Sequence, residues 1–250
     1  MCATIDDIYT EGILIEDNIR YKQYLTPERP LKFDANKWCY KKMPDLLTFK
    51  DDMIQQQSLH QAQGSTHLNF EFPQDVKPSI ELIQYLRAQN FNLGCVELYM
   101  IEAETLRELT TQTIHMKRMT SATIKDYFTV FRPLSMAYGE DYLVETLKYL
   151  QTVVEMPEHS IEYYIAYEKN EPVGIVNVIS TERHVEIDGF AVAESHQRQG
   201  IGSRMQAEIG RLAGQRPVIL VADAEDTAKD MYVNQGYVYQ CFQYSALRET

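Results

Sequence analysis

The sequence lacks a long apolar run, closely spaced cysteines and an excess of basic residues. Its N-terminus, MCATIDDIYTEG, is acidic where a signal peptide has basic residues followed by an apolar stretch. No run approaches the length needed to cross a membrane. We therefore expect a cytoplasmic protein with no membrane association. The 24 Lys and Arg residues against 36 Asp and Glu residues give a net charge of −12, which repels nucleic acid.

The cysteines are few and scattered. Cys2, Cys39, Cys95 and Cys241 include no C-x-x-C pair, and no histidine is spaced to complete a zinc site. We predict that they are reduced, mostly buried and without chemistry, and that the protein holds no metal.

The length and the composition of the chain fit two folded domains. The chain has 250 residues, of which 44% are hydrophobic, so it folds, and its length suits two cores better than one. Between the apolar run 95–101 and the next one at Ile114 lies the polar stretch ETLRELTTQT. A boundary near Thr113 is therefore predicted, with an α+β accessory domain at 1–112 and a second domain at 113–250.

The second domain shows a regular order of elements. After a strand near Ile114, apolar residues at helical spacing predict a helix capped by Thr120 or Ser121 and ended by Pro133. A second helix is predicted from Leu143 until the Met156-Pro157 pair. Three strand-like runs, SIEYYIAYE, PVGIVNVIS and HVEIDGFAVA, are separated by short turn-forming stretches and predict an antiparallel meander.

The remainder of this domain alternates helix and strand. Ile201, Met205, Ile209 and Leu212 mark one stripe of a helix that stops at Gly214. The strand VILVAD, a short helix over 226–234 and the aromatic strand YVYQCFQYSAL follow.

The end of the first domain resembles the end of the chain in its order of elements. HLNFEFP, a helix over Ile80–Leu86 and NLGCVELYMI predict strand, helix and strand. Two explanations stay open: a degenerate copy of the second domain, or an unrelated α+β domain with a common arrangement. This half has no G-x-G loop before a helix and no cluster of titratable residues, so we expect no cofactor in it.

The segment GFAVAESHQRQGIGS carries the chemistry. It places Gly200 and Gly202 where a chain that leaves a strand turns into a helix, so main-chain N–H groups can converge on a phosphate. It lacks the third glycine of a dinucleotide fingerprint and the Gly-Lys-Ser/Thr of an NTPase loop. Alone, the pattern is also typical of a simple turn.

The order of elements, this loop and the later sequence AKDMYVNQGY together resemble the GNAT superfamily of N-acetyltransferases over residues 114–245. The resemblance implies a mixed α/β fold with a mostly antiparallel sheet flanked by helices, and acetyl-CoA as co-substrate. Gln197, Gly200 and Gly202 match the family's Q/R-x-x-G-x-G/A loop, which binds pyrophosphate. The implied cofactor-binding set is Phe190, Ala191, Val192, Gln197, Arg198, Gln199, Gly200, Ile201 and Gly202. Three positions depart from the family pattern: Glu194 replaces a proline, Arg198 a glycine and Glu225 an asparagine.

Two catalytic residues are predicted. An alkyl amine has a pKa of about 10, so it must lose a proton before it attacks a thioester. Glu186 matches the position of a general base in some family members, acting directly or through water, and Asp188 on the same strand face is a weaker candidate. Tyr232 stands where the family commonly has its acid, which protonates the departing thiolate. His184 and His196 are expected to be surface groups.

The resulting prediction is an acetyl-CoA-dependent N-acetyltransferase that acts by direct attack in a ternary complex. The acceptor is a primary amine of a small molecule or peptide, such as a polyamine, an aminoglycoside or a protein amino group. A non-catalytic acyl-CoA-binding sensor is the alternative. A tandem enzyme with an aminoacyl-tRNA donor is disfavoured because no basic stretch is present. A homodimer is left open.

Overall fold

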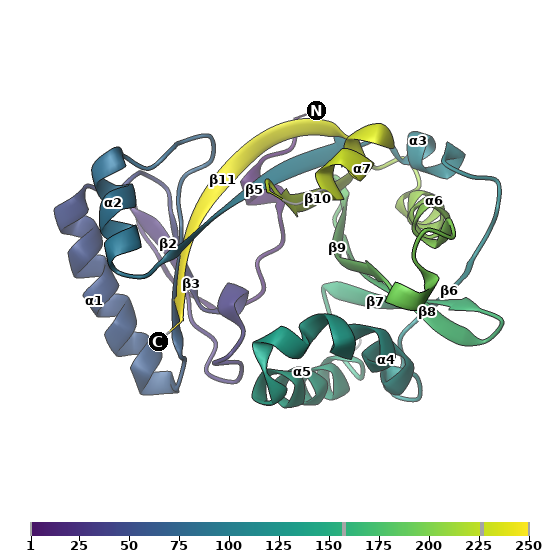
Figure 1. The fold of residues 1–250 in the computed structure, drawn as a ribbon, viewed down its shortest axis with the longest axis horizontal. Coiled ribbons are helices and arrows are strands. Elements are labelled where there is room, and N and C mark those ends of the chain that lie inside the picture. The colour runs from purple at the N-terminus through teal and green to yellow at the C-terminus, as the bar shows by residue number, and fades with distance from the viewer. Residues whose placement is uncertain (1, 157–158, 226–227, 250) are drawn as a thin grey trace. The chain divides into compact units, whose positions relative to one another are not determined.

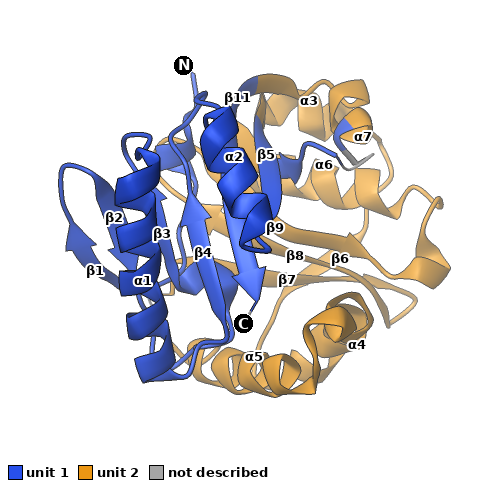
Figure 2. Ribbon diagram, turned by 60° about the vertical axis from the view of Figure 1, so that its left-hand side comes forward, with its two compact units in different colours: residues 1–98, 222–229, 240–250 blue, residues 99–221, 230–239 orange. Residues whose placement is uncertain are grey.

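The computed structural model describes residues 2–156, 159–225 and 228–249. They form two compact units (Figure 2): a first unit of residues 1–98, 222–229 and 240–250, and a second unit of residues 99–221 and 230–239. The boundary near Thr113 stays a prediction, because compactness does not measure which segment folds alone. Among the described helices, none combines the length and the apolar character needed to cross a membrane.

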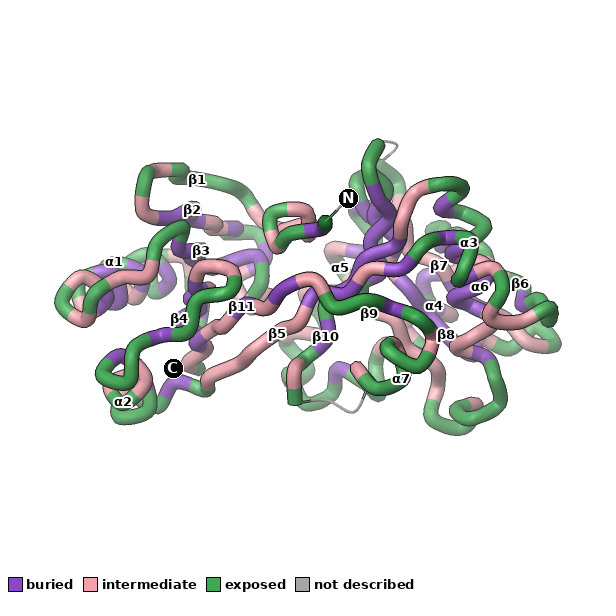
Figure 3. Tube along the Cα trace, turned by 90° about the horizontal axis from the view of Figure 1, so that it is seen from above, coloured by how far each residue is buried: buried purple, intermediate pink, exposed green. Residues whose placement is uncertain are grey.

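The first unit is a sheet with two helices packed on one face. Its strands follow the order β1-β2-β3-β4-β11-β5, antiparallel where β11 meets β4 and parallel where β3 meets β4. The strand β1 is exposed along its length (Figure 3). The bounds are η1 Ile5–Asp7, β1 Leu14–Asp17, β2 Tyr21–Tyr24, η2 Phe33–Ala35, β3 Lys37–Tyr40, α1 Leu46–Gln63, β4 His67–Glu71, α2 Ile80–Ala88, β5 Asn92–Ile101 and β11 Val238–Glu249.

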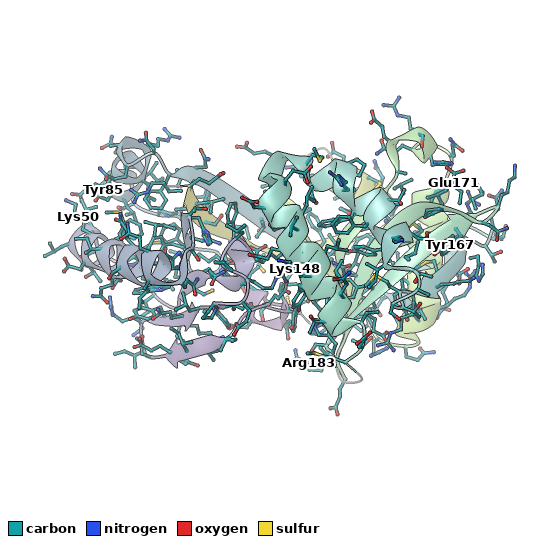
Figure 4. The ribbon with its side chains drawn as sticks, turned by 90° about the horizontal axis from the view of Figure 1, so that it is seen from below. Lys50, Tyr85, Lys148, Tyr167, Glu171 and Arg183 are labelled. Carbon is teal, nitrogen blue, oxygen red and sulfur yellow. The ribbon has the colours of Figure 1, made fainter. Side chains whose placement is uncertain are left out.

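The core of the first unit is aromatic. Alternation along β3 and β4 points Trp38, Tyr40, Phe70 and Phe72 to the helical face, where Trp38 packs on Phe70 and the other three pack on Phe49 of α1. At the edge of this core, the Lys50 ammonium of α1 lies 4.9 Å from the ring centre of Tyr85 on α2, which links the two helices (Figure 4). The predicted strand, helix and strand over 67–101 are confirmed as β4, α2 and β5.

The long helix α1 was not predicted, because its buried face is largely polar. Asp52 accepts two hydrogen bonds from the Arg20 guanidinium and one from the Tyr40 hydroxyl, each at 3.0 Å. The Gln56 amide donates to the main-chain carbonyl of Asn69 and accepts from its N–H, both at 2.9 Å. These bonds satisfy buried polar groups that would otherwise destabilise the unit.

Two histidines complete this polar face. His60 Nδ1 lies 2.6 Å from the carbonyl of His67, and His67 Nε2 lies 3.2 Å from the carbonyl of Asn36. A carbonyl only accepts, so each of these ring nitrogens carries the proton. In the described part of the chain, the other nitrogen of each ring is buried without a partner. Protonation would add a buried charge and an unpaired donor.

This arrangement predicts a loss of stability in mild acid. Burial, with a smaller contribution from His60, lowers the pKa of His67 from 6.5 to about 4. Below pH 6.5 the unfolded chain therefore binds more protons at this residue than the folded chain. The free energy of unfolding should therefore fall by about 3 kcal/mol as the pH drops from roughly 6.5 to 4. Above pH 6.5 the neutral His67 makes its full contribution to stability.

Urea unfolding at a series of pH values measures this effect. The His67→Gln variant should show a shallower pH dependence than wild type. The control variant, His115→Gln, changes an exposed histidine and should keep the wild-type slope. Equal slopes in wild type and His67→Gln would show that His67 is not responsible.

The second unit is also a helix-covered sheet, with strand order β10-β9-β8-β7-β6. The predicted meander is confirmed, because β6, β7, β8 and β9 pair antiparallel in turn, while β10 joins β9 in parallel. The helices α4 and α5 lie on one side of it (Figure 1). The bounds are α3 Ala103–Glu108, β6 His115–Arg118, α4 Ile124–Ser135, η3 Met136–Tyr138, α5 Glu140–Val153, β7 Ile161–Glu168, β8 Glu171–Ser180, β9 Val185–Val192, η4 Glu194–His196, α6 Ile201–Ala213, β10 Val218–Asp223 and α7 Ala228–Asn234.

Glycines allow α6 to approach its neighbours closely. A β-carbon on Gly174 of β8 would lie 2.5 Å from the Met205 sulfur of α6, and one on Gly210 would lie 2.8 Å from the carbonyl of Ala103 in α3. The Arg107 guanidinium also donates to the carbonyls of Gly210 and Gly214 at the end of α6. These contacts fix α6, the helix that follows the glycine loop.

Several predicted details of the second unit are wrong. Pro133 lies inside α4, which begins after Thr123 and continues to Ser135, because a proline in the last turn removes only one hydrogen bond. Leu212 of the predicted stripe is exposed. The helix α3 falls in the stretch interpreted as a junction. Pro157 and the predicted helix start at 226 lie outside the described residues.

Candidate functional site

The candidate site begins at a bulge in β9. Asn177 of β8 faces Asp188, whereas Ile175 faces Ala191, so β9 contains one additional residue at this point. Gly189 lies there with a φ of +54°, and a β-carbon on it would lie 2.7 Å from Asn177 Nδ2. Any larger residue would be strained there and would displace the Asn177 side chain. The bulge was not predicted, although a glycine inside a strand pattern is a sequence signal for one.

Beyond the bulge, one edge of β9 has no strand partner in the described chain. The parallel ladder to β10 contains Val185 with Val218 and Glu186 with Ile219, and it does not reach Phe190, Ala191 or Val192. The opposite edge of the same segment is paired with β8. The main-chain N–H and C=O groups of this segment that do not pair with β8 are therefore available to an extended ligand, apart from the Val192 carbonyl, which accepts a hydrogen bond from the Gln197 amide.

The predicted loop connects β9 to α6 through two left-handed residues. Arg198 has a φ of +61° and Gly200 a φ of +75°. The Gln197 amide donates to the carbonyl of Val192, and the Gln199 amide to that of Ser195, each at 3.2 Å. These two side chains therefore stabilise the conformation of the loop through hydrogen bonds to its own main chain and to the end of β9. Arg198 is exposed.

The start of α6 presents N–H donors. The first in-helix bond runs from the Arg204 N–H to the Gly200 carbonyl at 3.1 Å. The N–H groups of Ile201, Gly202 and Ser203 precede it and, by helix geometry, have no acceptor within the helix. No side chain caps this end, and Gly200 carries the backbone in a left-handed conformation. The arrangement attracts an anion, because the helix dipole adds to the donors.

The loop lies directly beside the unpaired segment of β9. A β-carbon on Gly202 would lie 3.7 Å from the Phe190 ring and 4.0 Å from Val192, in ordinary contact, whereas one on Gly200 would meet no atom within 4 Å. Buried Ile201 anchors the helix start. The structure thus brings the predicted loop residues and the predicted strand residues together.

Tyr232 lies on α7 and is half-buried. Its ring centre lies 5.4 Å from that of Tyr237, edge to face. The Tyr237 hydroxyl donates to Gln206 on α6 at 3.3 Å, and burial raises the pKa of Tyr237 above its usual range. Tyr237 is therefore a structural tyrosine that ties the region of Tyr232 to α6.

The two predicted carboxylates differ in exposure. Glu186 is 4% exposed, where β9 is paired on both sides, whereas Asp188 is exposed. Asp188 accepts a hydrogen bond from Asn177 Nδ2 at 3.0 Å, and Asn177 Oδ1 accepts one from the Tyr127 hydroxyl at 2.8 Å. This chain of bonds has no signal in the sequence, because Tyr127 fits the apolar stripe of α4.

The histidines and cysteines need corrections. His184, expected at the surface, is 7% exposed, whereas His196 is half-buried and shares a 2.9 Å hydrogen bond with Ser195. All four cysteines are free, as predicted, but only Cys241 is buried; Cys2 is exposed and the others are intermediate. The described residues contain no group of three or more metal-ligating side chains.

Two family models match separate parts of the chain, one mainly in the first unit and one in the second. Residues 159–239 match the family described as acetyltransferase (GNAT) domain, and residues 3–99 match a family described as domain of unknown function (DUF5613). No curated protein matches the chain.

Solved structures are similar along most of the chain. A functionally unknown conserved protein from Staphylococcus epidermidis ATCC 12228 is 42% identical, with 99% of this chain and 98% of that chain covered and a TM-score of 0.93. A GCN5-related N-acetyltransferase from Kribbella flavida is 14% identical, with 94% and 89% covered and a TM-score of 0.59. A tandem GNAT protein from the clavulanic acid biosynthesis pathway is 8% identical, with 85% and 75% covered and a TM-score of 0.51. The last two show the fold alone.

Proposed function

This chain belongs to the same family as the staphylococcal protein and carries a GNAT acetyltransferase domain at residues 159–239, and on that premise we propose that it is an acetyl-CoA-dependent N-acetyltransferase. The fold is one that supports acyl transfer. The observation that carries the finer proposal is the uncapped start of α6 beside the unpaired edge of β9. Acetyl-CoA joins a phosphate group to an extended amide chain. A site for it therefore needs a helix start for the phosphate next to a strand edge for the amides.

The residues present fit acetyl-CoA. The N–H groups at Ile201, Gly202 and Ser203 would hold the pyrophosphate, and exposed Arg198 is placed to pair with a phosphate oxygen. The edge of β9 at Phe190–Val192 would pair with the pantetheine amides. When bound, acetyl-CoA supplies the activated acetyl group. A well-aimed main-chain N–H near Val192 would stabilise the oxyanion by about 3 kcal/mol.

Proton transfer is assigned to Glu186 and Tyr232. Because Glu186 is 4% exposed, we assign it the removal of the amine proton through an intervening water. The amine then attacks the thioester carbonyl directly, and Tyr232 donates its hydroxyl proton to the departing sulfur. The acceptor is a primary amine of a small molecule or peptide, and its cationic form suits the negative charge of the chain.

An acyl-CoA-binding sensor remains a second candidate, favoured by the burial of Glu186 and by the hydrogen bond that already engages Asp188. A sensor binds acetyl-CoA without releasing the thiol. Release of free CoA on addition of an amine, followed with a thiol reagent across a panel of polyamines, aminoglycosides and peptides, distinguishes the two functions.

Acetyl-CoA binding should depend on Gly200. In Gly200→Ala a β-carbon in a left-handed conformation costs about 1 kcal/mol, so the loop relaxes and turns its N–H groups away from the phosphate. We expect acetyl-CoA to bind about tenfold more weakly by calorimetry.

Gly64→Ala is the matched control. Gly64 ends α1, has a left-handed backbone with φ +85° and ψ +16° and, like Gly200, has open space around its β-carbon position. It should lose similar stability and keep wild-type affinity. Equal affinities for wild type and Gly200→Ala would place the pyrophosphate elsewhere.

A further inference from the structure

The first unit contains a cavity of about 600 Å³ that no part of the proposed reaction uses. It lies between the N-terminal segment and the sheet face opposite the aromatic core. The charged and reactive groups in its lining are Asp6, Lys22, Cys39, Lys41 and Glu71. A cavity of this size accommodates a small metabolite.

The strand register collects these residues from distant positions in the sequence. Lys22 of β2 faces Cys39 of β3, and Cys39 faces Glu71 of β4. The side chains of directly opposed residues lie on the same face of a sheet. The expectation that this half holds no cluster of titratable residues is therefore wrong, because the cluster exists only once the strands pair.

The negative charge in this cavity is already neutralised. Glu71 accepts a hydrogen bond from the Lys37 ammonium at 2.7 Å on one oxygen and from the Cys39 thiol at 3.1 Å on the other. Lys37 is buried, so this pair is shielded from solvent. Burial and the charge of Glu71 raise the pKa of Cys39 well above its usual value, so the thiol stays a donor. A cationic ligand would have to displace the buried Lys37 from Glu71.

The positive charges are held much more loosely. The Lys22 ammonium lies 2.8 Å from the Asp6 carboxylate, and that side chain is 84% exposed. Lys41 pairs with Asp17, whose side chain is 46% exposed, and also donates to the Asn18 carbonyl at 2.6 Å, a bond that it can keep when a ligand replaces Asp17. Exposed ion pairs of this kind contribute at most about 1 kcal/mol, so a carboxylate from solution can replace either aspartate.

We propose that this cavity is a second binding site, which takes a small organic acid whose carboxylates contact Lys22 and Lys41 in place of Asp6 and Asp17. Gln74 and Gln243 also line the cavity, and their amides are held by hydrogen bonds to Asp75 and to the Phe72 carbonyl, so each offers at most its second amide hydrogen to a ligand. The Asp6 carboxylate occupies the position on Lys22 that a carboxylate of the ligand would take. The exposures favour an acid over an amine, because water can solvate the exposed aspartates once they are displaced, whereas Glu71 is held by the buried Lys37.

Calorimetric titration of the full chain with succinate, compared with its uncharged diamide succinamide, tests the proposal. Succinate should bind and succinamide should not. The Lys22→Gln variant should bind succinate at least about tenfold more weakly. The Asp6→Asn variant should bind it severalfold more tightly, because the internal competitor is gone.

A second ion pair in the same unit supplies matched controls. Lys32 and Asp34 lie 4.0 Å apart and do not line the cavity. Lys32→Gln and Asp34→Asn make the same charge changes and should leave the affinity for succinate unchanged. Absence of binding up to about 10 mM succinate would overturn the proposal. So would equal responses in the two pairs of variants, which would indicate a general charge effect or binding at the start of α6.

Discussion

Replacement of Tyr232 by phenylalanine should lower kcat for amine acetylation about a hundredfold, with little change in the affinity for acetyl-CoA. The departing thiolate would then leave without a proton donor, whereas the ring would keep its contact with Tyr237. The measurement is steady-state kinetics with the best amine of the panel, together with calorimetric binding of acetyl-CoA. Loss of kcat without loss of binding separates proton donation from a role in holding the cofactor.

Tyr237→Phe is the control for this variant. Tyr237 is five residues further along the chain, and its hydroxyl donates to Gln206 in the interior. Removal of that hydroxyl should cost about 1 kcal/mol of stability and leave kcat close to that of wild type. If Tyr232→Phe retained wild-type kcat, or if both variants lost activity equally, the acid assignment would be withdrawn.

Replacement of Glu186 by glutamine should lower kcat/KM about a hundredfold at neutral pH. The loss should shrink as the pH rises toward the pKa of the amine, about 10, because more of the acceptor is then already deprotonated. A pH profile of wild type and variant with one amine measures this convergence. A role of Glu186 in the fold alone would lower activity by a constant factor.

Asp188→Asn provides the comparison on the same strand. Asp188 is exposed and accepts a hydrogen bond from Asn177, so an amide at this position changes the charge but not the size of the side chain. It should retain most of the activity at every pH. A pH-dependent loss in Asp188→Asn, with wild-type behaviour in Glu186→Gln, would exchange the roles of the two carboxylates.

How well the sequence predicted the fold depends on how polar the buried faces are. In the second unit, α4 and α6 bury mostly apolar side chains at helical spacing, so their positions were predictable. In the first unit, α1 buries the polar side chains of Asp52, Gln56 and His60. Its buried face therefore does not show as apolar residues at helical spacing. Its hydrogen-bond partners lie on strands far away in the sequence, so no local rule reveals them.

The candidate site shows the same division. The glycines of the loop and the spacing around Tyr232 are local patterns, and they were visible in the sequence. The bulge at Gly189 and the end of the β9–β10 ladder depend on how strands pair. The bond from Tyr127 to Asn177 depends on how α4 packs on β8. The burial of Glu186 also follows from that pairing.

The place of β11 in the first unit has a consequence for synthesis of the protein on the ribosome. Residues 67–71 of β4 pair with residues 245–249, which are translated more than 170 residues later. Domains usually mature from the N-terminus onward during translation. Here the first unit keeps an open strand edge until residues 245–249 have been synthesised, so slow translation of the second unit exposes β4 to intermolecular pairing.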